Sequence, residues 1–477
     1  MQSGLLGVGE KRAVETAEWS IGIDFGTAFS KAAATRMTFE HGAALREIRP
    51  LRIGEAAGWD RPFLTPSSMF LDRSRIHFGA HAVERLLAAN QDERELVRSF
   101  KTILGANDFE EALNFYPRPC VDPDRTFRLR DLLVLYLAYL LVLVDIAAAA
   151  SFHRSGSVMT ASRLRFSRPG WIPGRIAAAH EAMTALFNQA HVVRRLLGDK
   201  LLAPDGVSYA DAREALDNAR ANPAPFANLD GGIYEASAVG VCHYSDPNAP
   251  NCLLIVDIGA GTTDVAGLMR APYRDDIRVI RTARRTIDVA GDNFDAVLLD
   301  LLVSKAKKLK SPADRSALWR RVIPNVRDLK EELFRNGAVQ IQFRNFKIKC
   351  TVKELEREAG FKSSLAEIKR LYETALAEVV QVGAREGART IGVVLAGGGS
   401  HLPAIRKLVT QKRRVGLRMK IVHLPTTPAW AHELGSAAEF ESLFAQLSAA
   451  FGAAISCAEQ GAAAVDEPGV AIGGRAT

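Results

Sequence analysis

The stretch that decides the fold is residues 252–269, which read CLLIVDIGAGTTDVAGLM. A run of apolar, mostly branched residues ends at Asp257, turns through Gly259 and Gly261, and continues as a second apolar run. This pattern predicts two strands joined by a tight turn. The glycines have no Cβ, so backbone N–H groups can lie against a polyphosphate, while Asp257 can face the accompanying metal ion. The stretch therefore indicates a phosphate-binding hairpin.

The same pattern occurs near the N-terminus of the sequence. Residues 19–34 read WSIGIDFGTAFSKAAA, in which an apolar strand again ends at an aspartate, Asp24. A turn through Gly26 and Thr27 leads to a second apolar strand. Two similar half-sites imply two similar lobes.

A third glycine-rich stretch follows near the C-terminus. Residues 391–409 read IGVVLAGGGSHLPAIRKLV, a strand that passes through Gly397, Gly398 and Gly399 into a helix. Pro403 suits the first turn of that helix. Three glycines in a row let the backbone lie flat against a ligand.

These three stretches, in this order, resemble the phosphate-1, phosphate-2 and adenosine motifs of the superfamily of actin, sugar kinases and heat shock protein 70. From about Ser20 to about Phe440, the chain resembles the ATPase domain of DnaK-type chaperones. Three further segments fall where that family has a Glu-Pro-x-Ala-Ala connection, a Gly-Gly-x-x-Phe-Asp turn and a nucleoside-contacting helix: 234–238, 290–295 and 329–333. The resemblance implies an α/β fold, the two-lobed actin-like ATPase with a duplicated ribonuclease H-like core. Each lobe would have a central mixed sheet with helices on both faces.

The resemblance also implies a division of the chain into parts. Residues 198–232 are longer than the family pattern requires, so we expect an insertion there, with one short helix over 209–221, near the interlobe cleft. The expected parts are a leader (1–18), lobe I (19–250, outer subdomain about 46–127), lobe II (251–424, outer subdomain about 291–371), a helix that returns to lobe I (425–447) and a flexible tail (448–477).

By the same resemblance, individual residues receive roles. Asp24 and Asp257 would hold Mg²⁺ through its water shell, and Glu235 would join the water network around the phosphates. The residues expected to carry the chemistry are Asp24, Glu235, Asp257 and Thr262. Those expected to contact the nucleotide are Gly26, Thr27, Lys31, Gly259, Gly261, Lys330, Gly397, Gly398 and Gly399.

The chain departs from the family pattern at residues that would contact the base and the γ-phosphate. Glu331 and Phe334 replace an arginine that stacks on adenine and a serine, which leaves the base preference open. By alignment, the family's γ-phosphate lysine falls at Val83, which cannot stabilise an anion. We expect Lys31 to replace it, as actins place a lysine there, with Lys101 as the nearest alternative.

Composition and charge exclude several other classes. The chain has 477 residues, 48% of them apolar, which suffices for real cores. Its five cysteines have no close pairs, so neither a zinc site nor a disulfide framework is predicted, and a cytoplasmic location fits. The net charge of +8 comes partly from basic runs without interleaved aromatics, so a nucleic-acid partner is not expected. The apolar run 132–144 is shorter than the roughly 18 residues of a membrane span and predicts a buried core helix.

We therefore expect a cytoplasmic protein that binds ATP or ADP with Mg²⁺, hydrolyses ATP weakly, and uses its nucleotide state to set lobe closure and partner binding. Residues 448–477 are too few for the peptide-binding domain of DnaK-type chaperones. The expected partner is accordingly a protein, either a co-chaperone or a client-binding subunit supplied in trans. Alternatives are an actin-like filament subunit and a degenerate scaffold that does not hydrolyse ATP. A sugar or acyl kinase would need a second substrate pocket, for which no motif is found.

Overall fold

The computed structural model describes residues 17–40, 43–89, 94–106, 108–153, 159–171, 173–246, 248–270, 277–306, 311–410, 419–432 and 438–455. Residues 1–16 of the predicted leader lie outside these ranges. The first strand begins at Ala17, two positions inside the leader that the sequence predicted.

Lobe I is built on a mixed sheet. Antiparallel strands lie on one side of the first strand, and parallel strands lie on its other side. The order is β3 (Ala43–Leu51), β2 (Phe29–Glu40), β1 (Ala17–Phe25), β7 (Met159–Arg168) and β9 (Leu229–Tyr234). The first three strands pair antiparallel, and β7 and β9 run parallel to β1. The phosphate-1 turn therefore lies at the end of the central strand.

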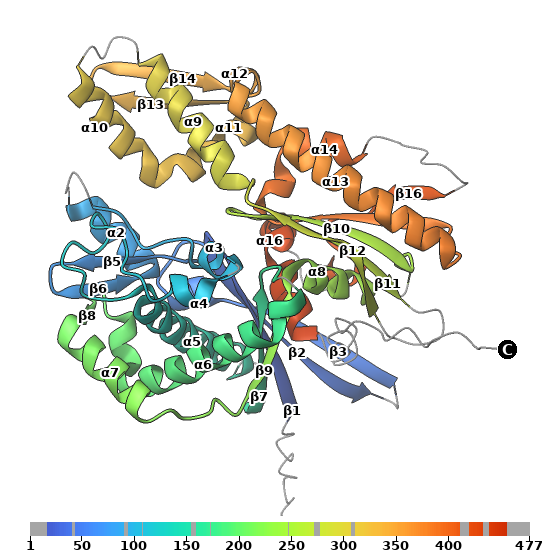
Figure 1. The fold of residues 1–477 in the computed structure, drawn as a ribbon, viewed down its shortest axis with the longest axis horizontal. Helices are drawn as coiled ribbons and strands as arrows, with labels where there is room; N and C mark the ends of the chain where they lie inside the picture. Colours follow the sequence, from blue (N-terminus) through green and yellow to red (C-terminus); the bar gives the residue numbers. More distant parts are fainter. Residues whose placement is uncertain are drawn as a thin grey trace, which may run out of the picture.

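Lobe II repeats the order and directions of these five strands. Its order is β12 (Ile277–Ile287), β11 (Thr263–Arg270), β10 (Cys252–Ile258), β15 (Thr390–Ala396) and β16 (Lys420–His423). The first three strands are antiparallel, and β15 and β16 run parallel to β10. Two sheets with the same order and the same directions confirm the predicted two-lobed, duplicated fold (Figure 1).

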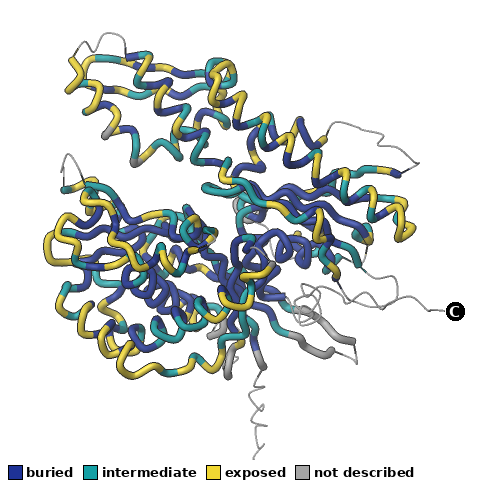
Figure 2. Tube along the Cα trace, in the orientation of Figure 1, coloured by how far each residue is buried: buried dark blue, intermediate teal, exposed yellow. Residues whose placement is uncertain are grey.

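Alternate residues of the central strands face two different helix layers. In lobe I, Ile21 and Ile23 pack with α5 (Leu129–His153) and α6 (Ile176–Leu197). In lobe II, Leu254 and Val256 pack with α13 (Ala359–Arg385), beside α14 (Pro403–Thr410). The opposite faces of both sheets share one core with α8 (Glu235–Tyr244) and α16 (Ala438–Ile455). These two helices lie between the lobes, and every residue of α8 is buried (Figure 2).

Helix α5 carries the long apolar run of the sequence. It is long and apolar enough to cross a membrane, but every residue from Leu132 to Val144 is buried inside lobe I. The helix packs against α6 and the sheet on one side and against the outer subdomain on the other. The prediction of a buried core helix is confirmed.

The outer subdomains stand on either side of the cleft. That of lobe I contains α1 (Ile53–Ala56), β4 (Thr65–Pro66), β5 (Met69–Asp72), β6 (Arg75–Phe78), α2 (Gly79–Ala89), α3 (Phe100–Gly105) and α4 (Phe109–Ala112). That of lobe II contains α9 (Gly291–Lys305), α10 (Pro312–Val322), η3 (Ile323–Asn325), α11 (Val326–Asn336), β13 (Ala338–Phe343), β14 (Phe346–Thr351) and α12 (Val352–Leu355). The structure also has short 3₁₀ helices, which are η1 (Pro173–Arg175), η2 (Gly198–Leu202) and η4 (Gly398–His401).

The predicted insertion does not lie at the cleft. Its helix is α7 (Tyr209–Ala221), which packs on α6 and α5 at the side of lobe I away from lobe II (Figure 1). The reason is an apolar stripe that α7 buries, Ala212, Ala215, Leu216 and Ala219. Just before it, β8 (Val207–Ser208) pairs with β6, so the segment completes the outer sheet of lobe I rather than forming a loop.

The end of the chain also differs from the prediction. The predicted helix was expected to end at residue 447; its described residues form α15 (Ala429–His432) and α16, which continues to Ile455. The first residues of the predicted flexible tail are thus helical, because Phe451 is fully buried and Gly452 packs on the α8 backbone at Ala238. Residues 456–477 lie outside the described residues.

Candidate functional site

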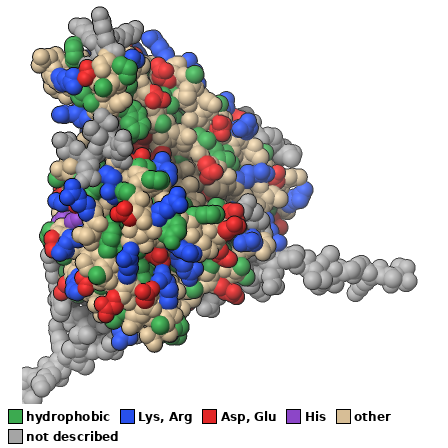
Figure 3. Space-filling view, turned by 60° about the vertical axis from the view of Figure 1, so that its left-hand side comes forward, with side chains coloured by type: hydrophobic (Ala, Val, Ile, Leu, Met, Phe, Trp, Pro, Cys, Tyr) green, Lys and Arg blue, Asp and Glu red, His purple; other side chains and the backbone are tan. Residues whose placement is uncertain are grey.

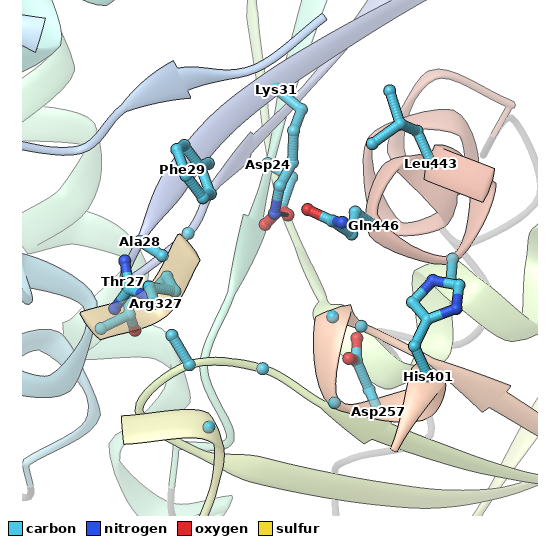
Figure 4. Close-up of a pocket in the computed structure, with 18 of the residues that line it drawn as sticks. Asp24, Thr27, Ala28, Phe29, Lys31, Asp257, Arg327, His401, Leu443 and Gln446 are labelled. Atoms are coloured by element: carbon cyan, nitrogen blue, oxygen red, sulfur yellow. Dashed lines mark hydrogen bonds and ion pairs between the residues drawn. The ribbon is translucent and has the colours of Figure 1, made fainter. Parts of the chain in front are cut away.

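A cavity of about 410 Å³ lies between the lobes, where the ends of the central strands meet. Its volume suits a cofactor-sized ligand. All the predicted site residues except one line it: Asp24, Gly26, Thr27, Lys31, Glu235, Asp257, Gly259, Thr262, Lys330, Gly397, Gly398 and Gly399. Figure 4 shows Asp24 and Lys31 on one side of this cavity and Asp257 on another.

Gly261 is the exception, and its surroundings explain why the turn needs a glycine. A Cβ at this position would lie 2.9 Å from Thr102 Oγ1 and 3.1 Å from the side chain of Thr27. The phosphate-2 turn of lobe II therefore packs directly on lobe I. Gly261 allows this approach rather than facing the cavity.

Asp24 is held as an anion by two lysines. It is 1% exposed, and Lys31, directly opposite it in the β1–β2 register, places Nζ 2.6 Å from Oδ2. Lys101 Nζ lies 3.3 Å from Oδ1, and the Ser167 hydroxyl donates to the same oxygen. Burial alone would raise the pKa of Asp24, but Lys101 and Lys31 outweigh it and hold the pKa well below its usual range.

Lys101 is the buried cation of the site. From the sequence, Lys31 was expected to supply the charge near the γ-phosphate, with Lys101 as the nearest alternative. Lys101 comes from α3, is 4% exposed, and forms ion pairs with both Asp24 and Glu235. Burial lowers its pKa, but the two carboxylates raise it further, so the ammonium group stays charged. Val83, where the alignment placed the family lysine, instead packs beside the Phe70 cluster of the outer subdomain.

The sequence did contain a signal for Lys101. It is a single lysine within the largely apolar segment 96–104, and lysines are almost never fully buried unless they are paired. Once Asp24 was identified as a site carboxylate, a buried lysine in lobe I was its natural partner.

Glu235 stands at the first position of α8, between the two hairpins. It is buried, and its carboxylate accepts from Lys101. Burial raises its pKa most, Lys101 opposes this, and Asp24 and Asp264 add to the rise, so that the pKa reaches about 7. A carboxyl group that titrates near neutral pH is suited to accept or donate a proton.

Asp257 differs from Asp24 because no lysine of the described residues forms an ion pair with it. It is 4% exposed at the end of β10, and its side chain has no hydrogen bond or ion pair to another described residue. The residue opposite it in the β10–β11 register is Asp264, where the first hairpin has Lys31. Burial, Glu235 and Asp264 raise the pKa of Asp257 well above its usual range.

This unneutralised carboxylate fits a divalent cation. Mg²⁺ keeps several waters and binds through one or two carboxylates together with substrate phosphates, rather than in an all-protein cage. Asp24 and Asp257 are therefore suited to hold the water ligands of Mg²⁺.

Asp264 is a site residue that the sequence argument missed, although it lies within the stretch that decided the fold. It accepts hydrogen bonds from Thr262 Oγ1 at 2.8 Å, from Thr286 Oγ1 at 2.7 Å and from the Tyr234 hydroxyl at 3.2 Å. Because Tyr234 precedes Glu235, Asp264 fixes both Thr262 and the start of α8.

The opposite end of the cavity is formed by α11 and the glycine turn after β15. Lys330 Nζ lies 2.7 Å from Asp295 Oδ1 and donates to the Gly291 carbonyl at 3.0 Å. Gly397 has a φ of +74° and packs against Asp257 and Ile258, a conformation and an approach that only glycine allows. Glu331 and Phe334, which depart from the family pattern at the base, both line the cavity.

One wall of the cavity comes from α16, which the sequence argument did not include. Its residues Leu443, Ala445, Gln446 and Ala449 line the site (Figure 4 labels Leu443 and Gln446). An apolar C-terminal helix offers no sequence signal for such a role.

Comparison with known proteins finds similarity to one family over part of the chain. Residues 232–418 match the family model described as "Hsp70 protein", a range that includes Glu235, the phosphate-2 hairpin and the glycine turn. The chain is also 27% identical over 218 residues to the "Chaperone protein HscA homolog" of Verminephrobacter eiseniae (strain EF01-2). That alignment covers 45% of this chain and 33% of the relative, so the chain spans about a third of the relative's length. Together with the duplicated fold, these matches support an ATPase domain of the Hsp70 family in this chain.

Proposed function

We propose that the chain binds ATP or ADP together with Mg²⁺ in the interlobe cavity and hydrolyses ATP slowly. The observation that carries this proposal is the convergence of two buried aspartates, one from each hairpin, on one cavity that also holds Lys101 and Glu235. When bound, Mg²⁺ would neutralise charge on the phosphates. Asp24 and Asp257 would hold its water ligands.

The remaining site residues would bind the phosphates and position water. The backbone of the two turns, at Gly26 and Gly259, and the hydroxyls of Thr27 and Thr262 are the donors for phosphate oxygens. Lys101 would add its charge at the buried end of the cavity. Glu235, with a pKa near neutrality, would accept the proton of the attacking water on its carboxylate.

Turnover should depend on pH through Glu235. Below pH 7 this carboxyl is protonated and cannot accept a proton, so phosphate release should rise as pH increases through about 7 and then level off. Glu235→Gln should be slower by roughly 10²-fold and should lose the inflection. Steady-state phosphate release between pH 5.5 and 9 checks this prediction. A wild-type profile without an inflection near pH 7, or an inflection retained in Glu235→Gln, would contradict the role.

Nucleotide state would set the closure of the lobes, because a ligand that contacts both lobes favours their closed arrangement. We further propose that closure sets the affinity for a protein partner, either a co-chaperone or a client-binding subunit in trans. A cytoplasmic location fits the cysteines, since the described ones, Cys120, Cys242, Cys252 and Cys350, are all free. Acidic and basic side chains alternate over the face in Figure 3, which gives no support to nucleic-acid binding there.

Two measurements separate this function from its alternatives. Phosphate release from Mg-ATP without an added acceptor is expected for an ATPase, whereas a kinase would need a second substrate and a degenerate scaffold would release none. After sedimentation with ATP the protein should remain in the supernatant, whereas a filament subunit would pellet. ADP formation that appears only with an added sugar or acyl acceptor, with the phosphoryl group transferred to that acceptor, would overturn the proposal.

A further inference from the structure

Helix α5 carries two buried tyrosines that the proposed mechanism does not use. Tyr136 and Tyr139 lie within its apolar run and are 0% and 3% exposed. A buried tyrosine hydroxyl usually has a hydrogen-bond partner. The Tyr136 hydroxyl has its partner in β2, the second strand of the phosphate-1 hairpin, whereas the partner of Tyr139 is Thr65 Oγ1, at 3.4 Å in β4.

The hydroxyl of Tyr136 belongs to a chain of buried hydrogen bonds. It donates to the Pro66 carbonyl at 3.2 Å, and Ser30 Oγ lies 3.0 Å from it and 2.9 Å from Ser67 Oγ. Burial raises the pKa of Tyr136 to about 12, so the hydroxyl keeps its proton. Because each hydroxyl has a single proton, the bonds run in one direction, from Ser67 to Ser30 to Tyr136 to the Pro66 carbonyl. The start of β2 is therefore tied to α5.

The ring of Tyr136 packs on two phenylalanines that are chain neighbours of charged site residues. Its centroid is 5.5 Å from that of Phe25 and 5.9 Å from that of Phe100. Phe25 directly follows Asp24, and Phe100 directly precedes Lys101. Both phenylalanines are buried, and their ring centroids are 6.3 Å apart. One side chain of α5 thus supports the ends of two segments that are far apart in the sequence.

The backbone just before Lys101 adopts a conformation that serine rarely takes. Ser99 has a φ of +63° and a ψ of 30°, in the left-handed region. Such a conformation persists only where the surrounding structure fixes it. The packing of Phe100 on Phe25 and Tyr136 is a restraint of this kind, and it determines where Lys101 enters the site.

We propose that Tyr136 is a positioning residue that fixes Asp24, Lys31 and Lys101 relative to one another. Its hydroxyl is bonded to Ser30, which directly precedes Lys31, and its ring holds the neighbours of the other two. Figure 4 shows Asp24 and Lys31 together at the cavity. Tyr136 is not among the described residues that line this cavity, so it acts through its neighbours. Its effect on turnover rests on the proposed hydrolysis of ATP.

The test is steady-state phosphate release from Mg-ATP. Tyr136→Phe removes the hydroxyl and keeps the ring, so kcat should fall about tenfold because Lys31 and Asp24 are held less firmly. KM should stay within about twofold of wild type, because the backbone donors of both turns remain.

The matched control is Tyr139→Phe. This variant removes a buried hydroxyl from the same helix, but the bond that it loses is to Thr65 and not to the phosphate-1 strand. Its kcat and KM should equal those of wild type, and melting temperatures of both variants measure the accompanying loss of stability. A wild-type kcat in Tyr136→Phe, or an equal fall in kcat for both variants, would overturn the proposal.

Ser30→Ala tests whether the effect passes through the hydroxyl chain. It removes the partner of Tyr136 without changing α5, so it should lower kcat by a similar factor. The double variant Tyr136→Phe with Ser30→Ala should be no slower than either single variant, within about twofold, because both substitutions remove the same hydrogen bond. Reductions that multiply in the double variant would contradict this route.

A second readout does not depend on nucleotide. In the nucleotide-free protein, Tyr136→Phe should increase hydrogen–deuterium exchange over residues 25–31, whereas Tyr139→Phe should not. If wild type released no phosphate, the proposed hydrolysis would fail, and this comparison alone would decide on Tyr136. Equal exchange over residues 25–31 in wild type and Tyr136→Phe would then refute its positioning role.

Discussion

Replacing Lys101 by alanine is expected to reduce ATP affinity or turnover by about a hundredfold. Lys101 is the buried partner of both Asp24 and Glu235, and loss of a charge-assisted contact costs up to about 3 kcal/mol, where 1.4 kcal/mol is tenfold. Without it, two carboxylates face the phosphates with one cation fewer. Calorimetric ATP affinity and single-turnover phosphate release measure the loss.

Lys31→Ala serves as the matched comparison. Lys31 is more exposed than Lys101 and, among the described residues, forms an ion pair with Asp24 alone, so its loss should cost about tenfold. This ranking reverses the one drawn from sequence, which put Lys31 first. If Lys31→Ala were the more damaging substitution, the original assignment would stand and Lys101 would be a structural cation. Thermal unfolding of both variants separates lost binding from lost folding.

Asp257→Asn should have opposite effects on function and on stability. Loss of its charge should weaken Mg-dependent ATP binding by tenfold to a hundredfold, about 1.4–2.7 kcal/mol. In the absence of nucleotide, the same change should stabilise the protein, because Asp257 is a buried carboxylate beside Glu235 and Asp264 with no cation paired to it.

The stability gain has a defined pH dependence. The pKa of Asp257 is raised in the folded state, so its cost is absent below its unfolded pKa of about 3.8, grows as pH rises from there to the folded value, and is constant above that value. Asp257→Asn should therefore raise the melting temperature at pH 8 but not at pH 4. Asp24→Asn is the matched control, and it should be destabilising at pH 8, because Asp24 has two lysine partners. A lower melting temperature for Asp257→Asn at pH 8 would contradict the account.

The sequence was sufficient for the fold because the decisive information is local and repeated. Each hairpin carries its aspartate, glycines and hydroxyls within a short stretch, and the register of β1 with β2 and of β10 with β11 follows from it. The glycine turn at 397–399 could be placed for the same reason. The helices and strands between the motifs did not have to be predicted one by one, because the two similar sheets bring the motifs together at the cavity.

Contacts between distant segments could not be predicted in the same way. Lys101 enters the site only because α3 packs near the end of β1, and alignment by residue spacing had put the family lysine at Val83. The α7 segment was assigned to the cleft from its position before Glu235, whereas its buried alanines carry it to the far side of lobe I. Likewise, α16 lines the cavity through apolar residues whose pattern is that of any core helix.

The central claim is that the interlobe cavity binds nucleotide with Mg²⁺, and titration calorimetry of the full chain with ATP tests it most directly. The account predicts saturable binding of one ATP per chain in the presence of Mg²⁺, strongly weakened by chelation of the metal and by Asp257→Asn. Absence of a binding signal at millimolar ATP with Mg²⁺ in the folded wild-type protein would contradict it.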